Sequence, residues 1–229
     1  EERFKKFNNI KKMNIAIIPA RAGSKRIKNK NIKSFFGKPL IFYSIKLALK
    51  SKLFDRVIVS TDSKKIAKIS KTFGAEVPFL RPKNISNDTA ITSKVLIHAV
   101  SKIETKKINY ICCIYPTAAI LKLRYLKKGF QMIKNFNSDC CLGVTEYDFP
   151  IQRAMQLKGN TTNFYWPKNK NLRSQSFQKL YHDAAQFYWL NLKKFLKSKE
   201  LYPKKMHAVK IPRKFVQDID EMEDFEIAK

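Results

Sequence analysis

Residues 15 to 31 have the sequence IAIIPARAGSKRIKNKN, and this stretch decides how the rest of the chain is interpreted. Its apolar first part ends at Pro19, a pattern typical of a buried strand followed by a turn. The loop after Pro19 is strongly basic and contains Gly23 and Ser24. Open α/β sheets bind ligands at loops that follow the carboxyl ends of parallel strands. The stretch therefore predicts a strand followed by a loop that binds a polyanion.

The chemistry of this loop supports phosphate as the ligand. Arg21, Lys25 and Lys30 can donate charge-assisted hydrogen bonds to phosphate oxygens. Ser24 adds a hydroxyl group, and Gly23 permits close approach of the backbone. The loop lacks the G-x-x-x-x-G-K-[ST] spacing of a P-loop. A solvated basic turn is the alternative, but the ordered combination of residues after an apolar strand favours phosphate binding.

Strand and helix patterns alternate along most of the chain. The predicted strands are 15–19, 56–61, 75–79, 110–115, 139–145, 186–190 and 206–211. The predicted helices are 39–49, 63–73, 95–103, 121–135, a short one after Asn191 and one after Asp220. This alternation predicts an α/β fold with a doubly wound, mainly parallel sheet. We interpret residues 1–12 as a basic tail and residues 13–229 as a single domain. Periodicity is lost from about 149 to 182, which predicts an arm that acts as a lid or a protruding interaction element.

Composition limits the class of protein. With 47 Lys and Arg against 18 Asp and Glu, the formal net charge is +29, which raises nucleic-acid binding as a hypothesis from another class. The cations are spread over the whole chain, so we expect no nucleic-acid partner. No apolar run approaches the roughly 20 residues of a membrane span, and we expect a cytoplasmic protein. The cysteines form two adjacent pairs, 112–113 and 140–141, that we interpret as free buried thiols.

Several further segments resemble a known family, in family order. They are PARAGSKR at 19–26 with KN at 30–31, FDRVIVSTDS at 54–63, GAEVPFLRP at 74–82, IYPTA at 114–118, FPIQRA at 149–154, LRSQ at 172–175, YHDAAQFYW at 181–189 and VQDID at 216–220. Together they resemble the CMP-sialic acid synthetases, also called acylneuraminate cytidylyltransferases. They are most similar to the pseudaminic acid cytidylyltransferase branch.

The resemblance implies a Rossmann-like nucleotidyltransferase fold and an enzyme that transfers CMP from CTP to an acidic nine-carbon keto-acid sugar. The sugar it implies first is pseudaminic acid, and the products are the CMP-sugar and pyrophosphate. It also implies a homodimer in which the arm reaches the partner's site. Other sugars stay open within the class, namely legionaminic acid, N-acetylneuraminic acid and the shorter KDO. A relative that has lost catalysis is a further alternative.

The resemblance also assigns roles to residues. Arg21, Lys30 and Asp218 are the expected catalytic residues. The expected nucleotide-binding residues are Arg21, Gly23, Ser24, Lys25, Lys30, Asn31, Arg81 and Thr92. The expected sugar-binding residues are Arg153, Arg173, Gln175, His182, Gln186 and Tyr188. The planar guanidinium of arginine suits the sugar's carboxylate better than lysine does.

The resemblance also implies a magnesium site at Asp218 and Asp220, which share a face of an extended segment and could hold Mg²⁺, an ion that needs few protein ligands. An acidic turn that caps the last helix is the alternative for this pair. The chain also departs from the family pattern. Ala22 and Ala185 stand where glycine is frequent, 119–120 replaces Pro-Phe, and Glu221 replaces a threonine. Alanine obstructs a left-handed backbone conformation, so we expect Ala185 to change the fit of the sugar in its pocket.

Overall fold

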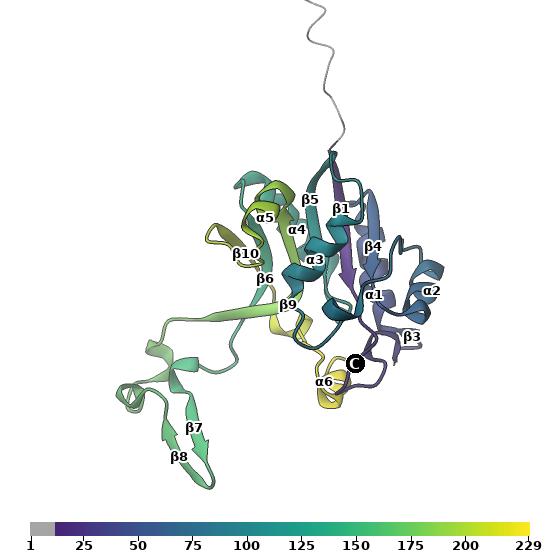
Figure 1. Ribbon diagram of the computed structural model, residues 1–229. Helices are drawn as coiled ribbons and strands as arrows, with labels where there is room; N and C mark the ends of the chain where they lie inside the picture. The colour runs from purple at the N-terminus through teal and green to yellow at the C-terminus, as the bar shows by residue number, and fades with distance from the viewer. Residues whose placement is uncertain (1–11) are drawn as a thin grey trace, which may run out of the picture.

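A six-stranded sheet forms the centre of the protein, with the strand order β10-β6-β9-β5-β1-β4 (Figure 1). The computed structural model describes residues 12–229, so the predicted basic tail lies outside the described residues except for Lys12. The strands are β1 (Met13–Pro19), β4 (Arg56–Ser60), β5 (Ile108–Ile114), β6 (Cys140–Glu146), β9 (Tyr181–Asn191) and β10 (Met206–Lys210). β9 runs antiparallel to both of its neighbours, and the other strands are parallel to one another. The predicted mainly parallel sheet is confirmed.

Helices cover both faces of the sheet. The helices α1 (Leu40–Ser51), α2 (Lys64–Thr72) and α4 (Leu123–Asn135) pack on one face, and α3 (Thr92–Ser101) and α5 (Leu192–Ser198) pack on the other. Side chains of β1 alternate between the two layers, with Ala16 and Ile18 facing the first and Ile15 and Ile17 the second. This is why the strand is apolar throughout: both of its faces are buried.

Shorter elements complete the fold. These are β2 (Ser34–Phe35), β3 (Lys38–Pro39), the closing helix α6 (Met222–Ile227), and 3₁₀ turns at Lys30–Ile32, Lys83–Ile85, Ile151–Arg153, Pro167–Asn169, Ser174–Ser176 and Arg213–Phe215. The side chain of Phe225 in α6 packs with Ile219, Phe35 and Leu40 in a small separate core. This core fixes the C-terminal segment beside the loop that follows β1. Within residues 12–229, no helix is both long and apolar enough to cross a membrane.

The predicted strand at 75–79 is wrong. The segment makes isolated bridges to the edge of β4, between Ile58 and Glu76 and between Thr61 and Leu80. It contains Pro78, which has no backbone N–H to donate to a ladder, and it lies at the open edge of the sheet. The cysteine prediction agrees with the structure, since all four are buried and free.

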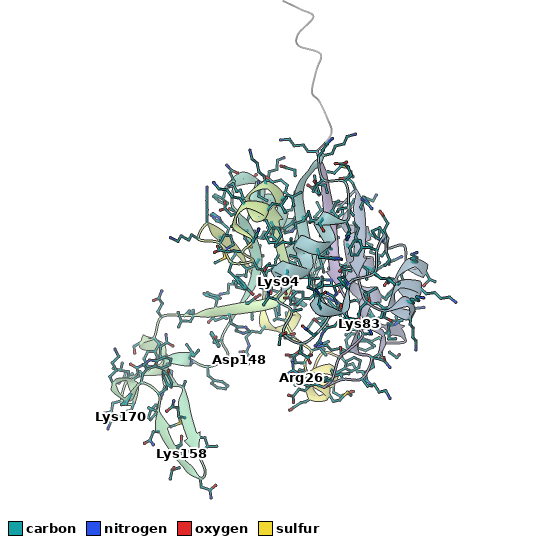
Figure 2. All side chains as sticks on the ribbon, viewed as in Figure 1. Arg26, Lys83, Lys94, Asp148, Lys158 and Lys170 are labelled. Atoms are coloured by element: carbon teal, nitrogen blue, oxygen red, sulfur yellow. The ribbon has the colours of Figure 1, made fainter. Side chains whose placement is uncertain are left out.

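The arm projects from the body as a separate limb (Figure 1). It carries a hairpin of β7 (Met155–Lys158) and β8 (Thr161–Phe164), and Figure 2 shows Lys158 and Lys170 far from Arg26 in the body. Its predicted end needs correction, because β9 already begins at Tyr181. His182 therefore belongs to the central sheet, where it pairs with Thr145.

Candidate active site

The loop after β1 is fixed to the neighbouring strand before it turns into the cleft. The backbone N–H of Ala20 donates to the carbonyl of Ser60 at 2.9 Å, and that of Ala22 donates to Asp62 Oδ1 at 2.8 Å. Farther along, Asn31 Nδ2 donates to the carbonyl of Arg21 at 2.9 Å. Both ends of the basic loop are therefore held. Ala22 does not adopt a positive φ, so alanine in place of the family's frequent glycine causes no backbone strain there.

A cleft of about 250 Å³ lies between this loop, the segment 81–92, the end of β5 and the C-terminal segment. Six of the predicted nucleotide-binding residues line it: Arg21, Ser24, Lys30, Asn31, Arg81 and Thr92. Asp218 and Asp220 line it as well. The structure thus brings together residues that lie up to about 200 positions apart in the sequence.

Two predicted residues, Gly23 and Lys25, do not line the cleft. A Cβ atom at Gly23 would meet nothing within 4 Å, so no protein atom of the described chain requires glycine there. Lys25 instead reaches across the mouth of the cleft, where its Nζ lies 2.8 Å from Asp88. The sequence did not single out Asp88 as a partner of the loop.

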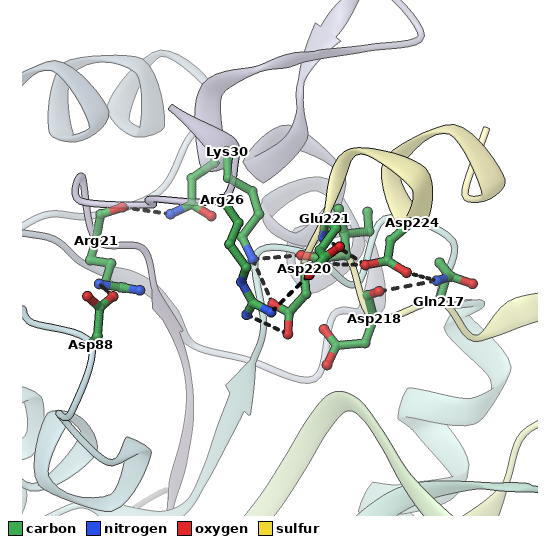
Figure 3. A network of polar contacts seen from close by, with 11 residues as sticks. Arg21, Arg26, Lys30, Asp88, Gln217, Asp218, Asp220, Glu221 and Asp224 are labelled. Atoms are coloured by element: carbon green, nitrogen blue, oxygen red, sulfur yellow. Dashed lines mark hydrogen bonds and ion pairs between the residues drawn. The ribbon is translucent and has the colours of Figure 1, made fainter. Parts of the chain in front are cut away.

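Ion pairs organise the basic loop (Figure 3). Asp88 lies 2.6 Å from Arg21 Nη1, and its hydrogen bonds with Lys25 and Arg21 lower its pKa. On the other side of the loop, Asp220 lies 2.8 Å from Arg26 Nη2 and 3.2 Å from Lys30 Nζ. In the protein alone, the loop cations are therefore balanced by carboxylates on two opposite walls.

Lys30 is the best anchored of these cations. Its side chain is 18% exposed, and its Nζ donates to the carbonyl of Ile219 at 2.6 Å as well as to Asp220. The hydrogen bond links the loop after β1 to the segment before α6, 189 positions away in the chain. Lys30 therefore fixes the two sides of the site relative to each other.

The Asp218–Ile219–Asp220 segment presents its carboxylates to the cleft because Ile219 is fully buried in the small core. The surrounding protein, and then the charge of Asp220, raise the pKa of Asp218 above its ordinary value, although its side chain is open to the cleft. For Asp220 burial also favours a raised pKa, but hydrogen bonds and charges of Lys30 and Arg26 outweigh it and lower the pKa.

The carboxylates that cap helix α6 are those of Glu221 and Asp224, rather than those of Asp218 and Asp220. Glu221 is the N-cap of α6 and forms a capping box with Asp224, whose Oδ2 accepts from the backbone N–H groups of Asp220 and Glu221. Glu221 in place of threonine thus keeps a capping side chain. Asp218 and Asp220 remain directed at the cleft.

Two buried residues that line the cleft, Arg81 and Asn31, offer groups for a nucleobase. Arg81 is 5% exposed, its Nε donates to Ser86 Oγ, and burial lowers its pKa. Asn31 is 4% exposed, and its Oδ1 has no hydrogen-bond partner among residues 12–229. A buried acceptor without a partner costs free energy unless a ligand or water satisfies it. The lining of the cleft therefore combines a buried arginine with an acceptor for a ligand's N–H or O–H group.

A second cavity, of about 1410 Å³, lies between the base of the arm and the body. Arg153 and His182 line it, as do Arg213 and Lys214, which the sequence analysis did not identify. Asp218 lines both this cavity and the smaller cleft. The two spaces therefore meet at Asp218.

The other predicted sugar-binding residues line neither space. Arg173 and Gln175 lie exposed on the arm. The structure places Gln186 and Tyr188 in the interior instead, where Gln186 Nε2 donates to the carbonyl of Phe215 and the Tyr188 hydroxyl donates to Asp183. The pairing of β6 with β9 shifts register between Leu142 and Val144, which breaks the simple alternation of side chains along β9.

Comparison with known proteins identifies the family. The family model described as "Cytidylyltransferase" matches residues 15–228. The chain belongs to the cytidylyltransferase family. A pseudaminic acid cytidylyltransferase of Campylobacter jejuni is 38% identical over 219 residues, which cover 94% of each chain. An N-acylneuraminate cytidylyltransferase of Escherichia coli is 29% identical, over 93% of this chain and 51% of the relative.

Solved structures agree on the fold of this cytidylyltransferase. A CMP:2-keto-3-deoxy-manno-octonic acid synthetase complexed with CTP superposes with a TM-score of 0.71 at 14% identity, covering 94% of this chain and 96% of the other. The 4-diphosphocytidyl-2C-methyl-D-erythritol synthase of Anaerococcus prevotii gives a TM-score of 0.64 at 11% identity, covering 95% and 96%. The predicted nucleotidyltransferase fold is confirmed.

Proposed function

We propose that the protein transfers the cytidylyl group of CTP to the anomeric hydroxyl of pseudaminic acid, giving CMP-pseudaminic acid and pyrophosphate. The hydroxyl oxygen forms a bond to the α-phosphorus of CTP, and the bond from that phosphorus to the β-phosphate bridging oxygen breaks. The observation that carries the proposal is the position of Asp218, which lines both the nucleotide cleft and the larger cavity. The relatives in Campylobacter jejuni support the choice of sugar.

The cleft can bind the two ends of CTP differently. Cytosine has a donor amine beside two acceptors, and these groups complement the unpartnered Asn31 Oδ1 and the Arg81 guanidinium in the cleft lining. Arg21, Lys25 and Lys30 would receive the triphosphate with the hydroxyl of Ser24. To do so they must exchange Asp88 and Asp220 for phosphate oxygens. Thr92 also lines the cleft, and its hydroxyl is suited to the ribose.

The two aspartates fit a magnesium ion. Desolvation by the surrounding protein, and then the charge of Asp220, raise the pKa of Asp218, and a divalent cation would favour the charged form of both carboxylates. Mg²⁺ takes few protein ligands, so two carboxylates together with phosphate and water oxygens could hold it. When bound there, Mg²⁺ supplies charge neutralisation at the phosphates and activation of a coordinated hydroxyl.

The arm would complete the site of a second copy in a homodimer. Its exposed apolar side chains include Phe149, which is 83% exposed, and Leu157, which is 76% exposed. Exposed apolar side chains of this kind favour a protein contact. Arg173 on the same arm would then meet the sugar carboxylate of the partner's site. The four free thiols suit a reducing compartment, and we place the reaction in the cytoplasm.

Subunit mixing tests the shared site. Arg173→Ala removes the cation with which the arm would bind the sugar carboxylate, and Asp218→Asn removes a carboxylate that the body contributes to the site. If the arm serves the partner, each mixed dimer has one intact site, and re-associated equimolar variants assayed with the sugar well below its KM recover about a quarter of the unaltered activity, against about a tenth for Arg173→Ala alone and almost none for Asp218→Asn alone. A monomeric protein by light scattering, or mixtures no more active than the variants alone, would refute the shared site.

The sugar is tested by pyrophosphate release from CTP and Mg²⁺ with pseudaminic, legionaminic and N-acetylneuraminic acids and KDO. ATP and UTP serve as nucleotide controls. We expect release with CTP and pseudaminic acid at least about a hundredfold faster in kcat/KM than with the other sugars. Faster turnover of another sugar in the panel would replace pseudaminic acid in the proposal but keep the reaction class.

A further inference from the structure

A half-buried carboxylate that lines the larger cavity, Asp183, has phenol groups as its partners. Asp183 Oδ2 accepts a hydrogen bond from the hydroxyl of Tyr188 at 2.6 Å and from that of Tyr202 at 2.7 Å. Its Oδ1 accepts from the backbone N–H of Ala185 at 2.9 Å. Three donors thus fix the orientation of one carboxylate. Charge-assisted hydrogen bonds of this kind are stronger than those between neutral groups.

The backbone around Asp183 is strained to make this arrangement. Ala185 has a φ of 49°, in the left-handed region that costs a residue with a Cβ free energy. It lies where the pairing of β6 with β9 shifts register. Bulges of this kind occur next to functional sites, where they redirect side chains. The hydrogen bond from Ala185 to Asp183 offsets this strain. The departure from the family's glycine therefore affects the Asp183 cluster.

The contacts continue from Asp183 to the nucleotide cleft. Tyr188 is 1% exposed, and its ring packs against that of Tyr115 with centroids 5.4 Å apart. The hydroxyl of Tyr115 lies 2.7 Å from Thr92 Oγ1. Tyr115 and Thr92 both line the nucleotide cleft, whereas Tyr188 lines neither space. A contiguous set of contacts therefore leads from Asp183 to the wall of the cleft.

We propose that Asp183 is a positioning residue for CTP, which acts through Tyr188 on Tyr115 and thereby holds Thr92 at the wall of the cleft. The proposal rests on the function proposed above. Each phenol stays neutral and able to donate, since burial raises the pKa of Tyr188 and of Tyr115, and raises that of Tyr202 to about 12. Because Asp183 is held by neutral donors, its orientation depends on the tyrosine hydroxyl groups.

Tyr188→Phe is the deciding variant, because it removes a hydroxyl that touches neither space. We expect kcat/KM for CTP to fall about tenfold, while KM for the sugar changes less than about twofold. Tyr115→Phe should have a similar or larger effect on CTP. In the double variant, kcat/KM for CTP should fall at most about twofold below its value in Tyr115→Phe, because the two hydroxyl groups act through the same set of contacts. Tyr110→Phe, at the other end of β5, is the matched control and should match the unaltered protein.

An unchanged kcat/KM for CTP in folded Tyr188→Phe would overturn the inference. So would a fall in kcat/KM in the double variant equal to the product of the falls in the two single variants. If Tyr188→Phe does not fold, Tyr202→Phe removes the more exposed partner of Asp183 and should lower kcat/KM for CTP about threefold; no change would overturn the inference. The dissociation constant of CTP with Mg²⁺, measured by calorimetry, separates this inference from the proposed function. If no sugar releases pyrophosphate, the function fails, and the CTP affinities of the same variants still decide the inference.

Discussion

The nucleotide cleft and the arm differ in where the contacts of their polar side chains come from. In the cleft, Lys30 is held by Ile219 and Asp220 from the far end of the chain. In the arm, the polar contacts are mostly local, such as those of Gln152 with Gln178 and Asn169, and Leu157 is 76% exposed. A cleft fixed from distant segments can bind a nucleotide within one chain. The arm, by contrast, exposes apolar side chains that would be covered only by contact with another protein surface.

The largest expected effect is in the cleft. Asp218→Asn should lower kcat/KM at least about a thousandfold, or about 4 kcal/mol, because it removes a carboxylate at the meeting point of both spaces. The midpoint of thermal unfolding should be unchanged or slightly higher, since the variant removes a carboxylate whose pKa is raised by desolvation and then by the charge of Asp220. Glu76→Gln, which alters an ion pair with Arg56 outside the cleft, is the control. Near-normal turnover of Asp218→Asn would remove this residue from the site.

Lys30→Ala should have the next largest effect. It removes a cation and the link to Ile219, so we expect a loss of about a hundredfold in kcat/KM for CTP. Lys28→Ala, an exposed lysine of the same loop, should change it less than about threefold. Steady-state kinetics of the two variants separates a fixed site from general electrostatic attraction. Equal losses in both would favour a diffuse basic surface.

A smaller effect is expected in the arm. Arg173→Ala should raise KM for the sugar about tenfold and leave KM for CTP unchanged, because the arm contributes to one substrate. Lys170→Ala, also exposed on the arm, controls for loss of charge. An unchanged sugar KM in Arg173→Ala would show that the carboxylate is bound elsewhere, with Arg213 and Lys214 in the larger cavity as the next residues to test.

The smallest effect concerns the junction between arm and body. Glu146 on β6 pairs with Lys179 at the end of the arm and with Lys210 on β10, and these hydrogen bonds lower its pKa. A lowered pKa contributes stability above the usual glutamate pKa of about 4.3, and this stability is lost as the pH falls through the folded-state value. Glu146→Gln should therefore lower the unfolding midpoint at pH 7 by at most about 2 °C, and this difference should shrink as the pH falls below about 4. A difference that persists in acid would point to a cause other than charge.

The sequence predicted the body better than the arm for a physical reason. The strand at 15–19 and the helix at 63–73 follow from apolar periodicity and from a cap at Ser63, which local chemistry determines. The cleft followed from a resemblance in motifs. In contrast, the ion pairs of Asp88 and the burial of Tyr188 depend on how distant segments meet and on a bulge at Ala185. No periodicity in the sequence encodes these contacts.

The most direct test of the central claim is ³¹P NMR of the protein with CTP, Mg²⁺ and pseudaminic acid. The account predicts that CTP is consumed while pyrophosphate and a phosphodiester resonance of the CMP-sugar appear in equal amounts. Subsequent addition of pyrophosphatase should drive the reaction further. Consumption of CTP without a sugar phosphodiester, or no consumption by folded protein that binds CTP, would contradict the account.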